Sequence, residues 1–292
     1  MTLNFFKYRR IAFFFSMILI ISSVFLFLKT KLNLGIDFKG GIMIEANFGK
    51  SPNLSDLRNQ LDALTPGNVE IQEFGSETNV LIRIEKNSDV EDEQKELINI
   101  LKNELPSDVD YRRIEFVGPK VGKELQLIAI KAVLFSLIAM FIYIWFRFSG
   151  WQFGLGALIA LFHDVITTIG FFSLSQIEFN LASIAAILTI AGYSINDTVV
   201  VFDRIRENIT KRKIPFSDLL NISITQTLSR TLMTSVTTLL ALGALLIFGG
   251  QVVKGFVSAM IWGVLIGTYS SIFVASPLIA FLGYKIAKEE NI

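Results

Sequence analysis

Residues 11–28 read IAFFFSMILIISSVFLFL, and the polar triplet Lys29–Lys31 follows directly. A helix of about 20 apolar residues crosses the hydrocarbon core of a bilayer, so this stretch predicts a membrane-spanning helix at positions 11–29. Basic residues at positions 7, 9 and 10 make the segment resemble a secretory signal, but no small-residue cleavage site follows the apolar run. We therefore expect the helix to be retained as an anchor.

Five more apolar runs of similar length follow along the chain. The whole sequence is 52% hydrophobic and only 18% charged, whereas a soluble domain is about a quarter charged. The sequence therefore predicts a membrane α-helical bundle of six transmembrane helices. Residues 125–284 form its five-helix part, with a cytoplasmic segment at 203–229. The five runs are Leu125–Phe146, Trp151–Leu174, Leu181–Phe202, Arg230–Phe248 and Gly255–Leu282.

Charged residues are concentrated between the first and second predicted helices. Positions 29–124 hold 31 of them, against 19 in the longer stretch 125–292. This distribution predicts a folded, water-exposed domain at 30–124. Basic residues favour the cytoplasmic side of a membrane, and here they fall on one side if the chain crosses six times. We therefore expect both termini in the cytoplasm and residues 30–124 outside it. The basic residues are Lys7, Arg9, Arg10, Arg147, Arg204, Arg206, Lys211, Arg212, Lys213, Lys285 and Lys288.

The segment 30–124 has the pattern of a compact α+β domain. Its expected order is β-α-β-β-α-β, which matches the ferredoxin-like arrangement. Such a sheet could bind an extended peptide at an exposed edge or dock against a partner subunit, and the pattern favours neither. The predicted strands are Gly41–Phe48, Val69–Phe74, Asn79–Glu85 and Val109–Val117, and the predicted helices are Leu54–Leu64 and Val90–Leu105.

Composition excludes several kinds of chemistry. The chain has no cysteine and a single histidine, so disulfides, thiolate sites and multi-histidine metal sites are excluded. A net charge of +1 argues against nucleic-acid binding. The stretch GPKVGKE at 118–124 resembles a phosphate-binding loop but is one residue short and ends in Glu124. We expect neither an enzyme nor a cofactor, and an energy source other than ATP.

Two ionisable residues in the apolar spans stand out. Asp197 lies near the cytoplasmic end of the fourth span, where burying a charge costs on the order of 2.5–3.5 kcal/mol. Tyr193 and Ser194 precede it by four and three residues, so we expect them to share its face and hydrogen-bond it. Arg230 opens the fifth span, and the hydroxyls of Thr234, Thr237 and Thr238 follow it as a candidate path for water.

A second polar group, His163 and Asp164, lies midway along the third span. Because they are neighbours on one helix, we expect their side chains to point in different directions. An acid, a base and hydroxyls on successive helices suit a proton relay. The alternative is that these groups only hold the helices together. Besides Asp197 and Arg230, the accessory relay candidates are His163, Asp164, Ser194 and Thr234.

Small residues recur at four-residue steps along the sixth span. Such a face lets another helix approach closely, so we interpret it as a packing surface. Pro277 is expected to kink the same helix. The small residues are Gly255, Ala259, Gly263, Gly267 and Ser271.

Five motifs together resemble the SecF family of bacterial protein-export subunits, and the resemblance covers nearly the whole chain. They are GIDFKGG at 35–41, FHD at 162–164, GYSINDTVVVFDRIRE at 192–207, SRT at 229–231 and GTYSSIFVASP at 267–277. The resemblance implies half of an RND-type transporter with a ferredoxin-like extracytoplasmic domain, in the bacterial cytoplasmic membrane.

The resemblance also implies a function. Members pair with SecD and use the proton-motive force to assist the SecYEG channel in late steps of preprotein translocation. In the family, proton coupling is associated with the positions of Asp197 and Arg230, so the proton is the expected coupling ion. YajC, YidC, the preprotein and membrane lipid are further expected partners. The alternatives are a proton-coupled small-molecule efflux subunit of the RND superfamily and a passive scaffold.

Overall fold

The computed structural model describes residues 4–64, 69–84, 91–106, 109–148 and 150–282. The chain divides into two compact units, which are treated separately below. The helical unit comprises Met1–Asn33, Ala132–Ile177 and Ala182–Ile292. The sheet unit comprises Leu34–Lys131 together with the short segment Glu178–Leu181.

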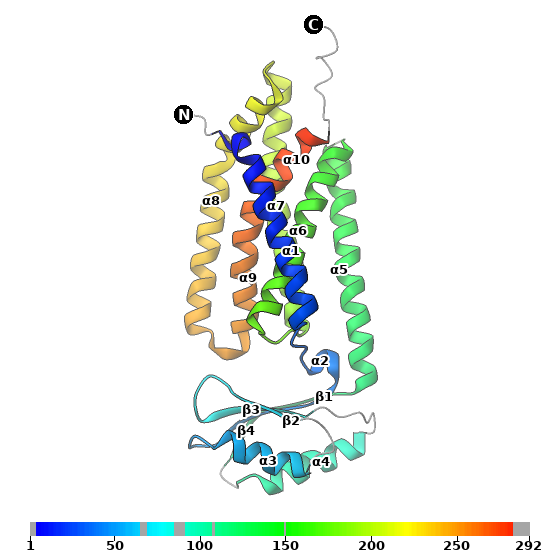
Figure 1. The fold of residues 1–292 in the computed structure, drawn as a ribbon, viewed down its shortest axis with the longest axis vertical. Helices are drawn as coiled ribbons and strands as arrows, with labels where there is room; N and C mark the ends of the chain where they lie inside the picture. Colours follow the sequence, from blue (N-terminus) through cyan, green and yellow to red (C-terminus); the bar gives the residue numbers. More distant parts are fainter. Residues whose placement is uncertain (1–3, 65–68, 85–90, 107–108, 149, 283–292) are drawn as a thin grey trace. The chain divides into compact units, whose positions relative to one another are not determined.

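Six helices in the described residues are long and apolar enough to cross a membrane, as predicted (Figure 1). In the bundle, α6 packs against α1 and α9, and α8 packs against α9. The helices are α1 (Arg9–Thr30), α5 (Pro119–Phe148), α6 (Trp151–Ser175), α7 (Leu181–Lys211), α8 (Phe216–Phe248) and α9 (Gly250–Ser270). The sixth span continues from α9 through a π-helical turn, η2 (Ser271–Ala275), into α10 (Ser276–Phe281).

The segment 203–229 is almost wholly helical, because α7 and α8 both extend beyond the predicted apolar runs. Only residues 212–215 separate the two helices. The extensions carry Ile205, Leu219 and Ile224, which are buried in one cluster with the rest of the bundle. Both helices therefore continue past their apolar runs, because apolar residues still recur on their inner faces.

Two predictions for the sixth span can be compared with the structure. A Cβ on Gly267 would lie 2.9 Å from the Cβ of Ser194, and one on Gly263 would collide with Ile190. The small residues therefore do bring α9 against α7. The disturbance expected from Pro277 takes the form of the π-helical turn directly before Ser276 and Pro277. Proline lacks the N–H that an α-helix needs at this point, and the hydroxyl of Ser276 donates to the Ser271 carbonyl (2.8 Å).

The sheet unit has the predicted ferredoxin-like order. Its four strands form an antiparallel sheet in the order β2-β3-β1-β4, and the helices α3 and α4 lie on one face of it (Figure 1). The strands are β1 (Gly41–Asn47), β2 (Val69–Glu73), β3 (Asn79–Ile84) and β4 (Asp110–Val117), and the helices are α3 (Leu54–Leu64) and α4 (Glu91–Glu104). The predicted strand end Glu85 and helix start Val90 lie outside the described residues.

The stretch GIDFKGG at 35–41 contacts residues 179–181, within the sheet unit. Asp37 lies in the short helix α2 (Ile36–Lys39), and its carboxylate accepts the Leu181 backbone N–H (2.9 Å). The Gly35 N–H donates to the Phe179 carbonyl (2.9 Å). Gly40 has a φ of 78°, which favours glycine. These contacts hold Phe179 and Leu181 within the sheet unit.

Candidate functional site

The membrane spans bury two aspartates. Asp164 on α6 is 0% exposed and Asp197 on α7 is 2% exposed. Both lie in the helical unit, and both were among the residues singled out from the sequence. Their hydrogen-bond environments differ, however, and the difference indicates different tasks.

The carboxylate of Asp164 is fully occupied. Its Oδ2 accepts hydrogen bonds from the hydroxyls of Ser194 on α7 (2.6 Å) and Ser270 on α9 (2.7 Å). Its Oδ1 lies 2.9 Å from Nδ1 of His163. The expectation that His163 and Asp164 would diverge was therefore wrong. The carboxylate reaches its neighbour's ring and the hydroxyls of two other helices at once.

The carboxylate of Asp197, in contrast, is not fully occupied by hydrogen bonds. Among the described residues its buried Oδ2 has no hydrogen-bond partner. The two hydroxyls expected to bind it point elsewhere, so that prediction was wrong. Ser194 donates to Asp164, and the phenol of Tyr193 donates to Ser235 on α8 (3.4 Å). The adjacent Thr198 pairs with Ser271 of the π-helical turn (2.9 Å).

Arg230 lies on α8 close enough for its charge to act on Asp197. It also lines a pocket of about 270 Å³ between α7 and α8. Most of the residues that line the pocket are polar, and they include Asn196, the residue before Asp197, but not Asp197 itself. The lining residues are Asn196, Val199, Val200, Asp203, Arg204, Glu207, Gln226, Thr227 and Arg230. Arg230 thus lies within electrostatic range of Asp197 and lines a pocket that can hold water.

The hydroxyls of Thr234 and Thr237 on α8 do not hydrogen-bond the carboxylate of Asp164 or of Asp197. Thr234 donates to the Thr231 carbonyl (2.9 Å), and Thr237 donates to the Met233 and Thr234 carbonyls (2.8 and 3.0 Å). Their hydroxyls are thus bound to their own helix, as is common for threonine in helices. Of the accessory candidates, His163, Asp164 and Ser194 form one cluster and Thr234 does not belong to it.

Sequence reasoning missed Ser270. The signal was available, since residues 268–271 read TYSS, a polar run inside an apolar helix. Nothing in the sequence, however, says which of the four side chains faces α6. Ser235 and Thr268, also missed as a pair, join α8 to α9 through their hydroxyls (2.7 Å).

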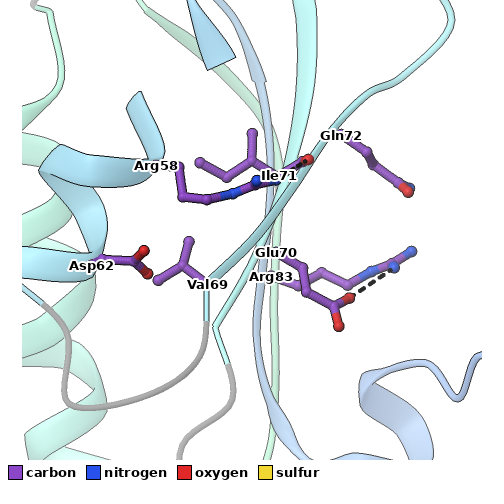
Figure 2. Close-up of a pocket in the computed structure, with 7 residues that line it drawn as sticks. All are labelled: Arg58, Asp62, Val69, Glu70, Ile71, Gln72 and Arg83. Atoms are coloured by element: carbon purple, nitrogen blue, oxygen red, sulfur yellow. Dashed lines mark hydrogen bonds and ion pairs between the residues drawn. The ribbon is translucent and has the colours of Figure 1, made fainter. Parts of the chain in front are cut away.

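A separate pocket of about 440 Å³ lies along the edge strand β2 of the sheet unit. Figure 2 shows Arg58 donating to the Ile71 carbonyl of this strand (3.3 Å) and Arg83 facing Glu70 (3.8 Å). Asp62, Val69 and Gln72 complete the lining. Arginine and carboxylate side chains beside an edge strand could receive a polar, extended chain.

Glu178, in the same unit, is ion-paired with Arg83. Burial raises the pKa of the Glu178 carboxyl above its ordinary value of 4.5, and the attraction of Arg83 offsets this only in part. The nearby Asp37 carboxylate raises that pKa further. In the described part of the chain, no group of three or more acidic, histidine or cysteine side chains converges in a way that could hold a metal ion.

Fold and site together define a class: a multi-pass membrane protein with a ferredoxin-like domain and an intramembrane carboxylate beside an arginine. Comparison with known families identifies the family within this class. The family model "Protein export membrane protein SecD/SecF, C-terminal" matches residues 96–285, and the "SecD/SecF GG Motif" matches residues 25–52. The chain belongs to the SecF family of protein translocase subunits, which confirms the resemblance seen in its motifs.

Curated relatives match almost end to end. Protein translocase subunit SecF of Rickettsia bellii is 45% identical over 287 residues, covering 97% of this chain and 94% of the relative. SecF of Vibrio alginolyticus is 47% identical over 285 residues, covering 97% and 90%.

Two solved structures are similar as well. SecDF of Thermus thermophilus, described as a translocon-associated membrane protein, is 36% identical with a TM-score of 0.84 over 98% of this chain. SecDF in a super-membrane-facing form is 37% identical with a TM-score of 0.70 over 97%. In both, the match covers 39% of the SecDF chain.

Proposed function

We propose that this chain, paired with a SecD subunit, uses the proton-motive force to assist late steps of preprotein translocation through SecYEG. The observation that carries the proposal is Asp197. In a member of the SecF family, it is a carboxylate buried in a membrane span, with an arginine in electrostatic range and an oxygen that accepts no hydrogen bond from the described residues.

The physical argument concerns charge. An ionised carboxylate is costly inside a bilayer, so such a residue faces a partner or water and is functional by default. Asp197 has an oxygen that accepts no hydrogen bond from the described residues and can receive a proton, and the positive charge of Arg230 acts on the same carboxyl group. A membrane potential supplies about 2.3 kcal/mol per charge moved through 100 mV, so proton flow can drive a conformational change without ATP.

The proposed orientation puts both termini in the cytoplasm. The basic residues at positions 204–213 support it, because they lie where α7 leaves the apolar run. The pocket beside Arg230 contains Arg204 and Glu207 from this end of α7. It would then be filled from the cytoplasm, and Asp197 would exchange its proton with that side.

The sheet unit is proposed to lie on the opposite side of the membrane and to contact the preprotein. The edge strand β2 with its pocket supports this role, since an extended chain can add to an open strand edge. SecD is proposed as the direct partner because the similar solved structures are of SecDF. YajC and YidC remain proposed as further partners of the assembled complex.

The test is translocation of a preprotein into inverted membrane vesicles, with and without an uncoupler. Asp197→Asn keeps size and hydrogen bonding but cannot ionise, so the uncoupler-sensitive part of export should disappear at equal abundance of the complex. The matched control is Asp218→Asn, which makes the same change at an exposed position in the first turn of α8. Stimulation that persists in Asp197→Asn would leave only a passive scaffold or another coupling residue.

A further inference from the structure

His163 and Asp164 form a second buried polar site, separate from Asp197. Three helices meet at the Asp164 carboxylate: its own helix α6, α7 through Ser194 and α9 through Ser270. His163 is 3% exposed, and its ring lies beside that of Tyr269 on α9, with centroids 6.1 Å apart. The hydroxyl of Tyr269 donates to the Ala12 carbonyl of α1 (2.8 Å), so a fourth helix is attached to the same place.

The stabilisation of Asp164 follows from its surroundings. The groups that face Asp164 are His163, two serine hydroxyls and, beyond the histidine, the Tyr269 phenol. No lysine or arginine in the described residues forms an ion pair with it. An unpaired negative charge in this position would be costly. The Asp164 carboxyl therefore depends on the imidazole and the two hydroxyls for its stabilisation.

A chain of direct hydrogen bonds connects the pair to the region of Asp197. From Asp164 it runs through Ser194, whose backbone carbonyl accepts the Ser271 hydroxyl (3.2 Å). Ser271 in turn pairs with Thr198, the residue after Asp197. Because one link in this chain is a backbone carbonyl, which has no proton to give, these bonds couple the positions of the helices.

We propose that His163 and Asp164 are positioning residues: a hydrogen-bonded pair that holds α6 to α7 and α9 and so keeps Asp197 in place beside the π-helical turn. This rests on the proposed coupling role of Asp197. In this role neither residue carries the transported proton. A relay role, by contrast, would require one of them to carry it.

Two substitutions separate the roles. In Asp164→Asn the amide oxygen still accepts from Ser194 and Ser270, and the amide N–H can donate to the neutral imidazole. Uncoupler-sensitive export should stay within about twofold of wild type, because every buried partner remains satisfied. Asp164→Ala removes the acceptor of Ser194 and the partner of the His163 ring, whereas Ser270 keeps the Gly267 carbonyl (3.1 Å), and we expect a loss on the order of tenfold.

A second readout does not depend on export. A hydrophobic carbodiimide reacts with protonated carboxyls in membranes, and mass spectrometry of the intact complex reports its attachment to Asp197. The pH dependence of this labelling should shift in Asp164→Ala and match wild type in Asp164→Asn. If the alanine variant does not accumulate, Ser194→Ala and Ser270→Ala each remove one hydrogen bond and should shift the profile less. Ser173→Ala is the control, since it removes a buried α6 hydroxyl that has no partner among the described residues.

Two outcomes would overturn the proposal. Export that fails in Asp164→Asn as completely as in Asp197→Asn, with Asp197 labelling unchanged, would make Asp164 a proton carrier. An unchanged labelling profile in Asp164→Ala, Ser194→Ala and Ser270→Ala would show that the pair does not position Asp197. Failure of the proposed function looks different, because Asp197→Asn would then export normally while the labelling of Asp197 still responded to the Asp164 variants.

Discussion

Asp164 and Asp197 are the same residue type, buried to the same degree, on helices that follow each other in the chain. Around Asp164, hydroxyls from α7 and α9 and a neighbouring imidazole occupy both carboxylate oxygens. Around Asp197, the nearest hydroxyls are used elsewhere and one oxygen accepts nothing among the described residues. A buried carboxyl group whose hydrogen bonds are all made stabilises one arrangement of the surrounding helices. A buried carboxyl group that lacks hydrogen-bond partners costs free energy. Hydrogen-bond satisfaction, more than burial, therefore separates the structural carboxylate from the candidate for coupling.

The largest expected effect comes from moving the carboxylate of Asp197 by one residue along α7. In Asn196→Asp/Asp197→Asn the acid turns by about 100° around α7, toward the pocket that already contains position 196. We expect uncoupler-sensitive export to vanish, because the acid would sit in the polar pocket and stay ionised. The same vesicle assay measures it, with Asn196→Ser as the control for losing the amide.

Full export by this double variant would contradict the distinction drawn between Asp164 and Asp197. It would mean that any acid in this turn of α7 is sufficient, and that the unsatisfied environment of Asp197 is not what matters.

A middle-sized effect is expected where the helices around Asp164 are closest. Gly267→Ala places a methyl group 2.9 Å from the Cβ of Ser194, so α9 must move away from α7 and weaken the bonds to Asp164. We expect a loss of stability of about 1–3 kcal/mol, as for other overpacked interiors. Thermal unfolding of the purified complex measures it.

Gly243→Ala on α8 is the matched control, because no atom lies within 4 Å of the added methyl group. It should leave the melting temperature unchanged or raise it, since alanine favours a helix. Equal behaviour of the two variants would contradict the view that close helix approach assembles the Asp164 cluster.

The smallest effect concerns Glu178, a partly buried carboxylate whose partner is the cation Arg83. Its pKa is raised by burial despite the Arg83 ion pair. A raised folded-state pKa favours the protonated form, so the contribution of Glu178 to stability is full below its ordinary pKa of 4.5 and is lost as the pH rises through the raised value. Relative to Glu178→Gln, wild type should therefore lose stability as the pH rises from 4.5 through the raised pKa, by about 1 kcal/mol or less.

Calorimetry of both proteins across this pH range provides the measurement. A difference that instead grows with pH would show that attraction to Arg83 outweighs burial. Glu178 would then differ from both Asp164 and Asp197, because its ionised form would be the one stabilised.

Much of this architecture could be read from the sequence. Apolar runs of sufficient length predicted the six spans, and alternating patterns predicted the β-α-β-β-α-β order, because hydropathy and periodicity are local properties of the chain. Asp197 and Arg230 stood out for the same reason, as charges in apolar surroundings. The helical continuation through 203–229 was missed because apolar content falls there while helical periodicity persists.

The tertiary structure alone decided which hydroxyl serves which carboxylate. Ser194 is three residues from Asp197 and was expected to bind it, yet it serves Asp164 on another helix. Ser270 joins it there. These choices depend on the rotation and register of packed helices, set by close contacts such as that of Gly267 with Ser194. Spacing along one helix specifies a shared face, but the partner on that face comes from a helix distant in sequence. That is why the sequence determined where the acids lie, and packing determined which of them was left unsatisfied.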